Sequence, residues 1–244
     1  MPDRAAATLR RSLRLLGEFR YEQSDGARFY RALAADSVHQ VGSWVDLAGA
    51  GVLDVGGGPG FFHDAFAARG ARYVAVEADV GELVAHGGAP APRTVLADGA
   101  RLPFADGTWD VVYCSNVAEH LPRPFDLADE LLRVLRPGGT LLLSYPMWLS
   151  ANGGHETSPW HYLGGHRARR RYERRHGRPP KNAYGTTMFA MTAAAGLRWA
   201  ARQPSADVLA AFPRYHPWWA HWVVRLPGVR ELLTWNLLLV LRKR

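Results

Sequence analysis

The amino-acid sequence predicts an α/β fold whose sheet is mostly parallel. Between residues 51 and 145, short β-branched or apolar runs alternate with segments of helical length. Such alternation is typical of parallel strands joined by right-handed crossovers. A glycine-rich turn at 56–60 follows the first of these runs. Of the 244 residues, 48% are hydrophobic, which is enough to bury the core of one large domain.

Two helices are expected before the first strand. The first has an apolar stripe at the three- and four-residue spacing of an amphipathic helix, formed by Leu9, Leu13, Leu16 and Phe19. A break with helix-capping residues at 24–26 precedes the second helix, which we expect to end near Gly42.

Seven strands follow from the remaining apolar runs. Five of them are expected to be parallel and two to close the sheet edge, in the order 51–55, 72–77, 94–97, 109–115, 140–145, 206–212 and 236–241. Helices are expected between several of them, at 60–69, 124–135 and 186–196. Arg136-Pro137-Gly138-Gly139 is a typical stop signal after the second of these helices.

The chain is predicted to form one domain in four parts. Residues 1–44 would be an N-terminal helical cap, 45–146 the core that binds a ligand, and 183–244 the C-terminal part of the sheet. Between the last two lies 147–182, an insertion after the fifth strand that is rich in histidine, arginine, glycine and tryptophan. We expect this insertion to cover the carboxyl ends of the strands, where open α/β sheets bind ligands.

The positive charge of the chain is concentrated in this insertion. The net charge is +8, and eight arginines and lysines fall between Arg167 and Lys181 with only Glu173 opposing them. Such a run is either a solvated helix face or a patch that binds an anion, and nucleic acid, anionic lipid and acidic substrates are the classes of partner that it allows.

The sequence also gives an expectation for the cellular location of the protein. No stretch reaches the roughly 18–20 apolar residues that span a bilayer, and Met1 to Arg20 lacks the apolar region of a signal peptide. The only cysteine, Cys114, lies in an apolar run typical of a buried thiol. We therefore expect a cytoplasmic protein. Peripheral contact with the inner face of the membrane is a hypothesis, since tryptophan and arginine favour that boundary. The residues concerned are Trp218, Trp219, Trp222, Arg214, Arg225 and Arg230. A dimer or core contact is the alternative for this whole group of residues.

The glycine-rich turn and two carboxylates predict a nucleoside site. Glycines let the backbone turn sharply and approach a ligand closely. The NAD fingerprint would need glycine at position 61, which is Phe61, and no lysine or arginine lies in the turn to meet a diphosphate. Glu77, at the end of the second strand, could accept hydrogen bonds from ribose hydroxyls. Asp98, after the third, could accept one from an adenine amino group or simply close a turn.

The motifs occur in an order that resembles the class I S-adenosylmethionine-dependent methyltransferases, and the type 11 subgroup in particular. The resemblance covers about 45–145 and rests on 52–60, Glu77, 98–104, 109–112 and 135–139. It implies a Rossmann-like, seven-stranded, mostly parallel sheet with helices on both faces, and S-adenosylmethionine as the cofactor.

The resemblance also implies the role of individual residues. Gly56, Gly58 and Gly60 would flank the methionine moiety, and Asp54 would orient its amino group directly or through water. Glu77 would hold the ribose, and Asp98 with the backbone of Gly99 and Ala100 would hold the adenine. Ser115 and Asn116 would lie beneath the sulfonium, and His120 either faces the site or caps a helix. The expected cofactor-binding set is completed by Gly57, Phe61, Ala78 and Tyr21, although core packing would also explain Tyr21.

Methyl transfer is an in-line displacement, so the main task of such an enzyme is to align the acceptor and exclude water. A hydroxyl acceptor would make a general base useful, and a histidine suits that role near pH 7. The candidates are His120, His155 and His161. A histidine that only supports a loop is the alternative for each. The spacing of His155, Glu156 and His161 differs from H-E-x-x-H, so we expect no metal site.

The function expected from these features is methylation of a small-molecule, glycan or lipid-linked acceptor, on oxygen, with nitrogen and carbon left open. DNA is not expected as a partner, because 114–117 lacks the Asn-Pro-Pro-Tyr type of motif associated with methylation of base amino groups. Three alternatives remain: a noncatalytic module that docks an anionic partner, an RNA methyltransferase, and an NAD-dependent oxidoreductase, which Phe61 disfavours. The acceptor and the oligomeric state do not follow from the sequence.

Overall fold

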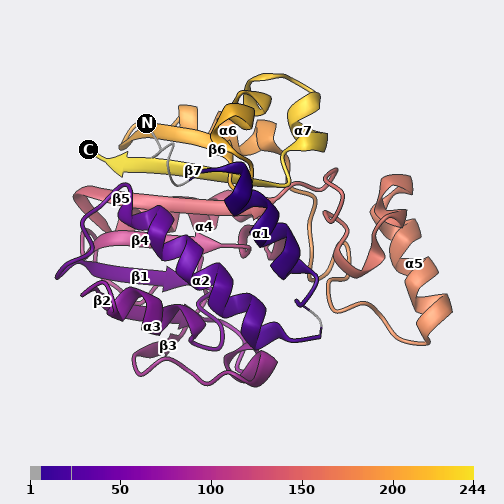
Figure 1. Ribbon diagram of the computed structural model, residues 1–244, viewed down its shortest axis with the longest axis horizontal. Coiled ribbons are helices and arrows are strands. Elements are labelled where there is room, and N and C mark those ends of the chain that lie inside the picture. The colour runs from indigo at the N-terminus through magenta and orange to yellow at the C-terminus, as the bar shows by residue number, and fades with distance from the viewer. Residues whose placement is uncertain (1–6, 23) are drawn as a thin grey trace.

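The computed structural model describes residues 7–22 and 24–244 and contains a seven-stranded sheet (Figure 1). The strand order is β3-β2-β1-β4-β5-β7-β6. The strands are β1 (Gly51–Val55), β2 (Arg72–Glu77), β3 (Thr94–Leu96), β4 (Trp109–Ser115), β5 (Leu135–Pro146), β6 (Ala206–Pro213) and β7 (Asn236–Lys243). Strand β7 runs in the direction opposite to the other six strands and pairs antiparallel with β5 and β6. The predicted fold class is confirmed.

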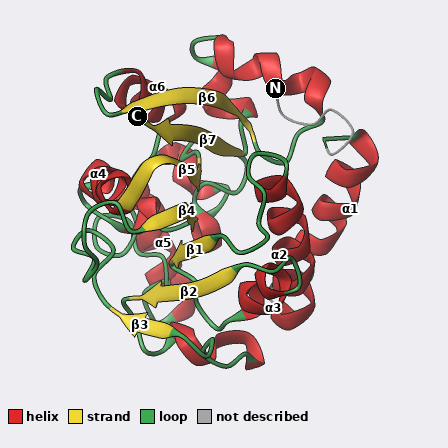
Figure 2. Ribbon diagram, turned by 90° about the vertical axis from the view of Figure 1, so that its left-hand side faces the viewer, coloured by secondary structure: helices red, strands yellow, loops and turns green. Residues whose placement is uncertain are grey.

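Helices cover both faces of this sheet (Figure 2). The α-helices are α1 (Leu9–Phe19), α2 (Gly26–Gly42), α3 (Phe61–Ala67), α4 (Pro124–Val134), α5 (Gly165–His176), α6 (Ala193–Ala201) and α7 (Val229–Leu233). Short 3-10 helices are η1 (Glu82–Gly87), η2 (Ala118–His120), η3 (His155–Thr157), η4 (Trp160–Leu163) and η5 (Trp218–Arg225). Buried side chains of α4 and α6 pack on one face, and those of α2 and α3 pack on the other.

Helix α1 forms where it was expected, but of its apolar stripe only Phe19 packs against the core. Leu9, Leu13 and Leu16 are exposed, and Leu15 is the buried residue instead. The inner face is fixed by an ion pair from Arg11 to the buried Asp36, with Nη2 and Oδ2 2.6 Å apart. The periodicity therefore predicted the helix correctly and its buried face wrongly.

The helix predicted at 186–196 is wrong in position. Helix α6 begins after Thr192, whose hydroxyl accepts a hydrogen bond from the backbone N–H of Ala195. The backbone before it is bound by other segments: Phe189 N–H donates to the carbonyl of Glu119, and Trp148 N–H donates to the carbonyl of Met191. These contacts replace the hydrogen bonds of a helix.

Strand β5 is longer than predicted because it begins at Leu135 and takes in the expected stop signal. The register against β4 shifts between Trp109 and Val111, and Gly138 has a φ of +77°. A bulge of this kind lets a strand continue through a Pro-Gly-Gly sequence. The other predicted strand and helix bounds hold within a few residues.

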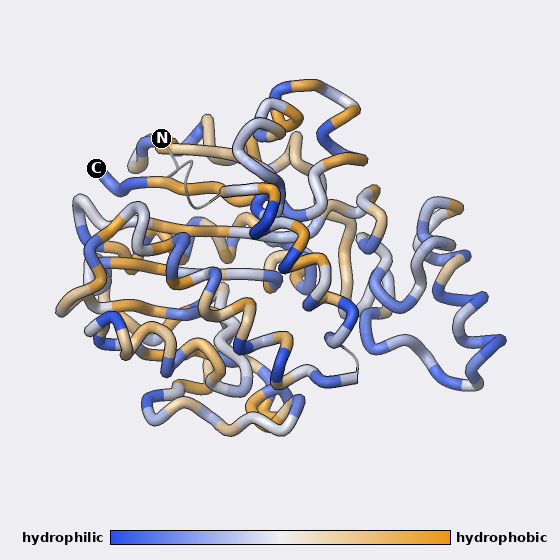
Figure 3. Tube along the Cα trace, viewed as in Figure 1, coloured by the Kyte–Doolittle hydropathy of each residue, from blue (hydrophilic) through white to orange (hydrophobic). Residues whose placement is uncertain are grey.

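The insertion at 147–182, all of which the structure describes, forms no strand and contains α5. This helix lies to one side of the sheet and is strongly hydrophilic (Figures 1 and 3). Most of its arginines are exposed, and Arg169 pairs with Glu173 within it.

Candidate cofactor and acceptor site

The predicted cofactor-binding residues meet at one edge of the sheet. The glycine turn follows β1, Glu77 ends β2, Asp98 follows β3, and Asn116 follows β4. Since β3, β2, β1 and β4 are adjacent and parallel, their carboxyl ends lie side by side (Figure 1). This is the edge at which open α/β sheets bind ligands.

The glycine turn combines close packing with one open position. Gly56 and Gly60 have positive φ angles, and a Cβ on them would lie 2.1 Å from Val117 and 2.5 Å from the carbonyl of Ala89. Gly58 has a φ of +52°, and its Cβ would meet no atom of the described residues within 4 Å. The turn therefore presents bare backbone at Gly58, which a ligand can approach.

Glu77 is held against this turn. Its Oε2 accepts a hydrogen bond from Gly58 N–H at 3.2 Å, and its Oε1 accepts one from Ala78 N–H at 2.8 Å. The side chain is only half-buried, so a ligand in the turn can also reach the carboxylate. An open glycine backbone beside a fixed carboxylate fits a nucleoside that carries an amino-acid moiety.

Asp98 is exposed and closes the turn after β3. Its Oδ1 accepts a hydrogen bond from Ala100 N–H at 2.9 Å. Gly99 packs closely, because a Cβ there would lie 3.0 Å from Leu127 and 3.1 Å from Val55. Asp98 therefore stabilises this turn, and its predicted contact with adenine stays a prediction.

Asp54 lies behind the glycine turn. It is 2% exposed, and its Oδ2 accepts a hydrogen bond from the Tyr73 hydroxyl at 2.6 Å. Burial raises the pKa of Asp54 to about 7. A Cβ on Gly57 would lie 3.4 Å from the same oxygen, so the carboxyl group supports the turn from below.

At the end of β4, Ser115 is bound from within the protein. Its hydroxyl accepts hydrogen bonds from Arg214 Nη1 at 2.5 Å and from the Ser144 hydroxyl at 3.1 Å. Asn116 is exposed with a φ of +58°, and its Oδ1 accepts a hydrogen bond from Asn236. These contacts fix the end of β4 where the resemblance puts the sulfonium.

Arg214 itself is completely buried, so for this residue the structure agrees with the core contact and not with the membrane hypothesis. Besides Ser115, it donates hydrogen bonds to the hydroxyls of Tyr113, Ser37 and Ser144 at 2.6–2.8 Å. Burial acts to lower the pKa of Arg214, but these surroundings, led by Tyr113, raise it overall. Four hydroxyls thus replace water around this guanidinium.

The two tyrosines near the site lie in different surroundings. Tyr21 is half-buried beneath the guanidinium of Arg28, whose Cζ is 3.7 Å from the ring centre. Tyr30 on α2 stacks on Phe61, the first residue of α3, with ring centres 5.8 Å apart. Its contact joins the helical cap to the exit of the glycine turn, and the role predicted for Tyr21 stays a prediction.

His120, at the end of η2, lies near the same edge. Its Nδ1 is 2.8 Å from the carbonyl oxygen of Thr187, and its Nε2 is 3.9 Å from Oε1 of Glu119. The side chain is 37% exposed, which leaves the ring accessible. The ring centre of His155 lies 6.2 Å away, so the structure brings these two candidates together.

His155 and His161 are both in less accessible positions. Burial lowers the pKa of His155 to about 4. His161 is 1% exposed, its Nε2 is 3.2 Å from the carbonyl oxygen of Ser150, and burial lowers its pKa. His161 therefore has the surroundings of a residue that supports its loop.

The sequence analysis missed three residues that support the site: Tyr73, Glu119 and Asn236. Glu119 is 1% exposed, and neither of its carboxylate oxygens has a hydrogen-bond partner among the described residues. Its position next to His120 was a signal in the sequence. Tyr73 and Asn236 act across strands that are far apart in the chain, so no local signal identifies them.

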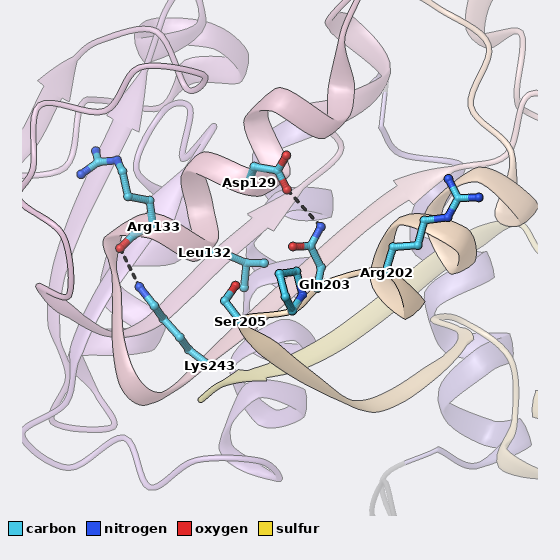
Figure 4. Close-up of a pocket in the computed structure, with 8 residues that line it drawn as sticks. Asp129, Leu132, Arg133, Arg202, Gln203, Ser205 and Lys243 are labelled. Carbon is cyan, nitrogen blue, oxygen red and sulfur yellow. Dashed lines mark hydrogen bonds between the residues drawn. The ribbon is translucent and has the colours of Figure 1, made fainter.

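A hollow of about 540 Å³ lies on the opposite edge of the sheet (Figure 4). Its polar groups bind one another: Asp129 accepts hydrogen bonds from Trp199 and Gln203, and Lys243 donates one to the carbonyl of Arg133. It contains none of the predicted site residues.

The fold and the site define a class I S-adenosylmethionine-dependent methyltransferase. Residues 53–143 match the family described as a methyltransferase domain. An uncharacterized methyltransferase of Mycobacterium marinum is 55% identical over 248 residues, which cover 98% of this chain and 96% of the relative. The chain belongs to this methyltransferase family. The noncatalytic module and the oxidoreductase are thereby set aside.

Solved structures agree on the fold. A methyltransferase from Mesorhizobium loti, described as S-adenosylmethionine dependent, has a TM-score of 0.56 at 18% identity, covering 88% of this chain and 98% of its own. The cyclase SpnF has a TM-score of 0.53 at 17% identity, covering 86% and 81%. A cyclase on this fold shows that the site, and not the fold, determines the reaction.

Proposed function

We propose that the protein transfers the methyl group of S-adenosylmethionine to an oxygen atom of a small-molecule, glycan or lipid-linked acceptor, with His120 as the general base. When bound, the cofactor supplies a methyl group on a positively charged sulfur. Glu77 and the backbone at Gly58 would hold it. The chain's remaining task is to orient the acceptor, exclude water and remove the hydroxyl proton.

The contact between His120 and Thr187 carries this proposal. A carbonyl oxygen can only accept, so Nδ1 of His120 at 2.8 Å must bear the hydrogen. In the neutral ring, Nε2 then has the free lone pair. This tautomer is the one that a general base requires at Nε2.

Glu119 supports the same role. Its buried carboxyl group is 3.9 Å from Nε2 of His120, where it would stabilise the positive charge that forms when the ring takes up a proton. Burial raises the pKa of Glu119 to about 7, and the neighbouring His120 acts in the opposite direction. The electrostatic attraction between a buried carboxylate and a neighbouring histidine is strongest when that histidine is protonated.

His155 would shape the acceptor side without adding charge. With a pKa of about 4 it is neutral at neutral pH. It lies beside His120 and within the loop that follows β5. We propose that it contacts the acceptor and that His120 is the group that takes the proton.

The test uses His120→Asn, because an asparagine side chain can still donate to the carbonyl of Thr187 but cannot act as a base. Purified protein is incubated with isotope-labelled S-adenosylmethionine and with polar and lipid extracts of bacterial cells, and labelled products are identified by mass spectrometry and carbon NMR. We expect an O-methyl product whose formation falls about 100-fold or more in the variant, while cofactor affinity is unchanged.

A matched control is His39→Asn, on the exposed face of α2, which should retain full turnover. A product methylated on nitrogen or carbon would contradict the acceptor assignment. Full activity of His120→Asn on an oxygen acceptor would contradict the assignment of the base.

A further inference from the structure

Two neighbouring segments of the molecule expose large apolar side chains. On α1, Leu9, Leu13 and Leu16 are 50–58% exposed, and on η5, Trp218, Trp219 and Trp222 are 43–54% exposed. We name these six residues the Leu/Trp surface. Large apolar side chains exposed on neighbouring segments suggest a site of interaction.

Several contacts hold α1 and Ala7 before it against residues 213–235, the segment that contains η5. Trp218 N–H donates to the carbonyl of Ala7 at 2.7 Å, and Arg11 donates to the carbonyl of Arg214 at 3.0 Å. At the other end of the helix, the rings of Phe19 and Trp235 are 4.5 Å apart. The region from β6 to β7 and helix α1 are adjacent in both ribbon views (Figures 1 and 2).

The leucines of α1 lie on the side of this helix that is turned away from α2. Ion pairs attach the other flank to α2: Arg14 to Asp36 at 3.7 Å, and Glu18 to Arg28 at 2.9 Å. Because successive residues are about 100° apart, the leucine stripe is rotated roughly 150° from Arg14 and Glu18. The stripe therefore points away from α2, and its leucines are exposed.

The charges around the Leu/Trp surface are predominantly positive. Residues 7–20 and 213–235 contain seven arginines and two glutamates, although Arg214 is buried and Arg11, Arg14 and Arg230 are ion-paired. Both glutamates are engaged, Glu18 with Arg28 and Glu231 with the first backbone N–H groups of α6. Arg10, Arg20 and Arg225 are exposed. An anionic partner is the one that complements this charge.

We propose that the Leu/Trp surface binds the protein peripherally to an anionic lipid bilayer. Leucines on one flank of a helix can enter the interfacial region, tryptophan favours that depth, and flanking arginines attract anionic headgroups. No helix of the described residues is long and apolar enough to cross a membrane.

The position of this surface suits an acceptor taken from the bilayer. Strand β6 runs parallel to β5 and leads directly into η5, so η5 lies at the same sheet edge as the glycine turn and His120. A bilayer held there lies beside the acceptor side of the site. Binding to lipid does not depend on the acceptor proposal, and the experiment below measures it without turnover.

The experiment is flotation of the full chain with vesicles of phosphatidylcholine alone or mixed with phosphatidylglycerol. We expect binding to the anionic vesicles, weakened by salt. Leu9→Gln/Leu13→Gln/Leu16→Gln and Trp219→Ser/Trp222→Ser should each lower the partition coefficient by about tenfold or more. The matched control is Arg170→Gln/Arg174→Gln, which removes two exposed charges from α5 and should retain most of the binding.

A second measurement requires no substitution. Brominated lipids should quench the tryptophan fluorescence of the parent protein when these rings enter the interface. Absence of binding to anionic vesicles would overturn the proposal. So would loss of binding in the α5 variant with retention in both surface variants. A dimer that dissociates in the leucine variant, with no quenching in the parent, would assign the surface to a second copy instead.

Discussion

Arg214 donates a hydrogen bond to the hydroxyl of Ser115 at 2.5 Å, and this bond connects the residue after β6 to the end of β4. The same guanidinium binds Ser37 on α2 and Ser144 on β5. One buried side chain therefore holds together the strand end beneath the predicted sulfonium position and the helical cap above the sheet.

Replacing Arg214 by methionine should lower the free energy of unfolding by about 2–4 kcal/mol. The substitution leaves several buried hydroxyls without their donor, among them Tyr113 and Ser37. Urea unfolding measures the change. Arg175→Met, at an exposed position of α5, is the control and should change stability by less than about 0.5 kcal/mol. Equal stability of the two variants would show that the buried network contributes nothing.

Glu77→Ala should weaken the binding of S-adenosylmethionine and S-adenosylhomocysteine by about 10- to 100-fold, since hydrogen bonds to a charged group are lost. Isothermal titration calorimetry measures both ligands. Asp207→Ala removes an exposed carboxylate on β6 and should leave both affinities unchanged. Unchanged affinity in Glu77→Ala would refute the assignment of this residue to the ribose.

His155 should make the folded protein less stable in acid. Burial lowers its pKa from 6.5 to about 4, so between these values the unfolded chain binds more protons. Its contribution is fully present above pH 6.5 and is lost as the pH falls towards 4. His120, His161 and Lys181 act in the same direction as burial, and Glu156 acts against it.

The variant for this test is His155→Asn, because asparagine tolerates the positive φ of +46° at this position. Between neutral pH and pH 4, the parent should lose up to about 3 kcal/mol more stability than the variant, as measured by urea unfolding at several pH values. His39→Asn serves as the exposed control and should keep the pH dependence of the parent. Parallel pH profiles for the parent and His155→Asn would contradict the burial of this ring.

The sequence predicted those parts of the molecule that depend on local signals. The strands of the parallel sheet are contiguous apolar runs, and the glycine turn and Glu77 follow directly from them, so their common edge could be expected. The buried face of α1 could not be predicted in this way, because it depends on an ion pair between Arg11 and Asp36 of α2.

Other features that depend on contacts between distant parts of the chain could not be predicted for the same reason. Arg214 lies in a stretch of tryptophan, histidine and arginine that resembles a surface, and its burial depends on hydroxyls supplied by α2, β4 and β5. The helix predicted at 186–196 does not form there, because Phe189 N–H donates a hydrogen bond to the carbonyl of Glu119, which is 70 positions earlier.

The sheet order has a consequence for the nascent chain. Strand β7 is made last but lies between β5 and β6. During translation, β6 therefore has no place to pair, and the long apolar strand β5 remains an open edge until residues 236–243 have left the ribosome. Unpaired edges of this kind recruit other strands. A ribosome that stalls before these residues emerge would leave the other six strands without β7 and prone to aggregate through β5.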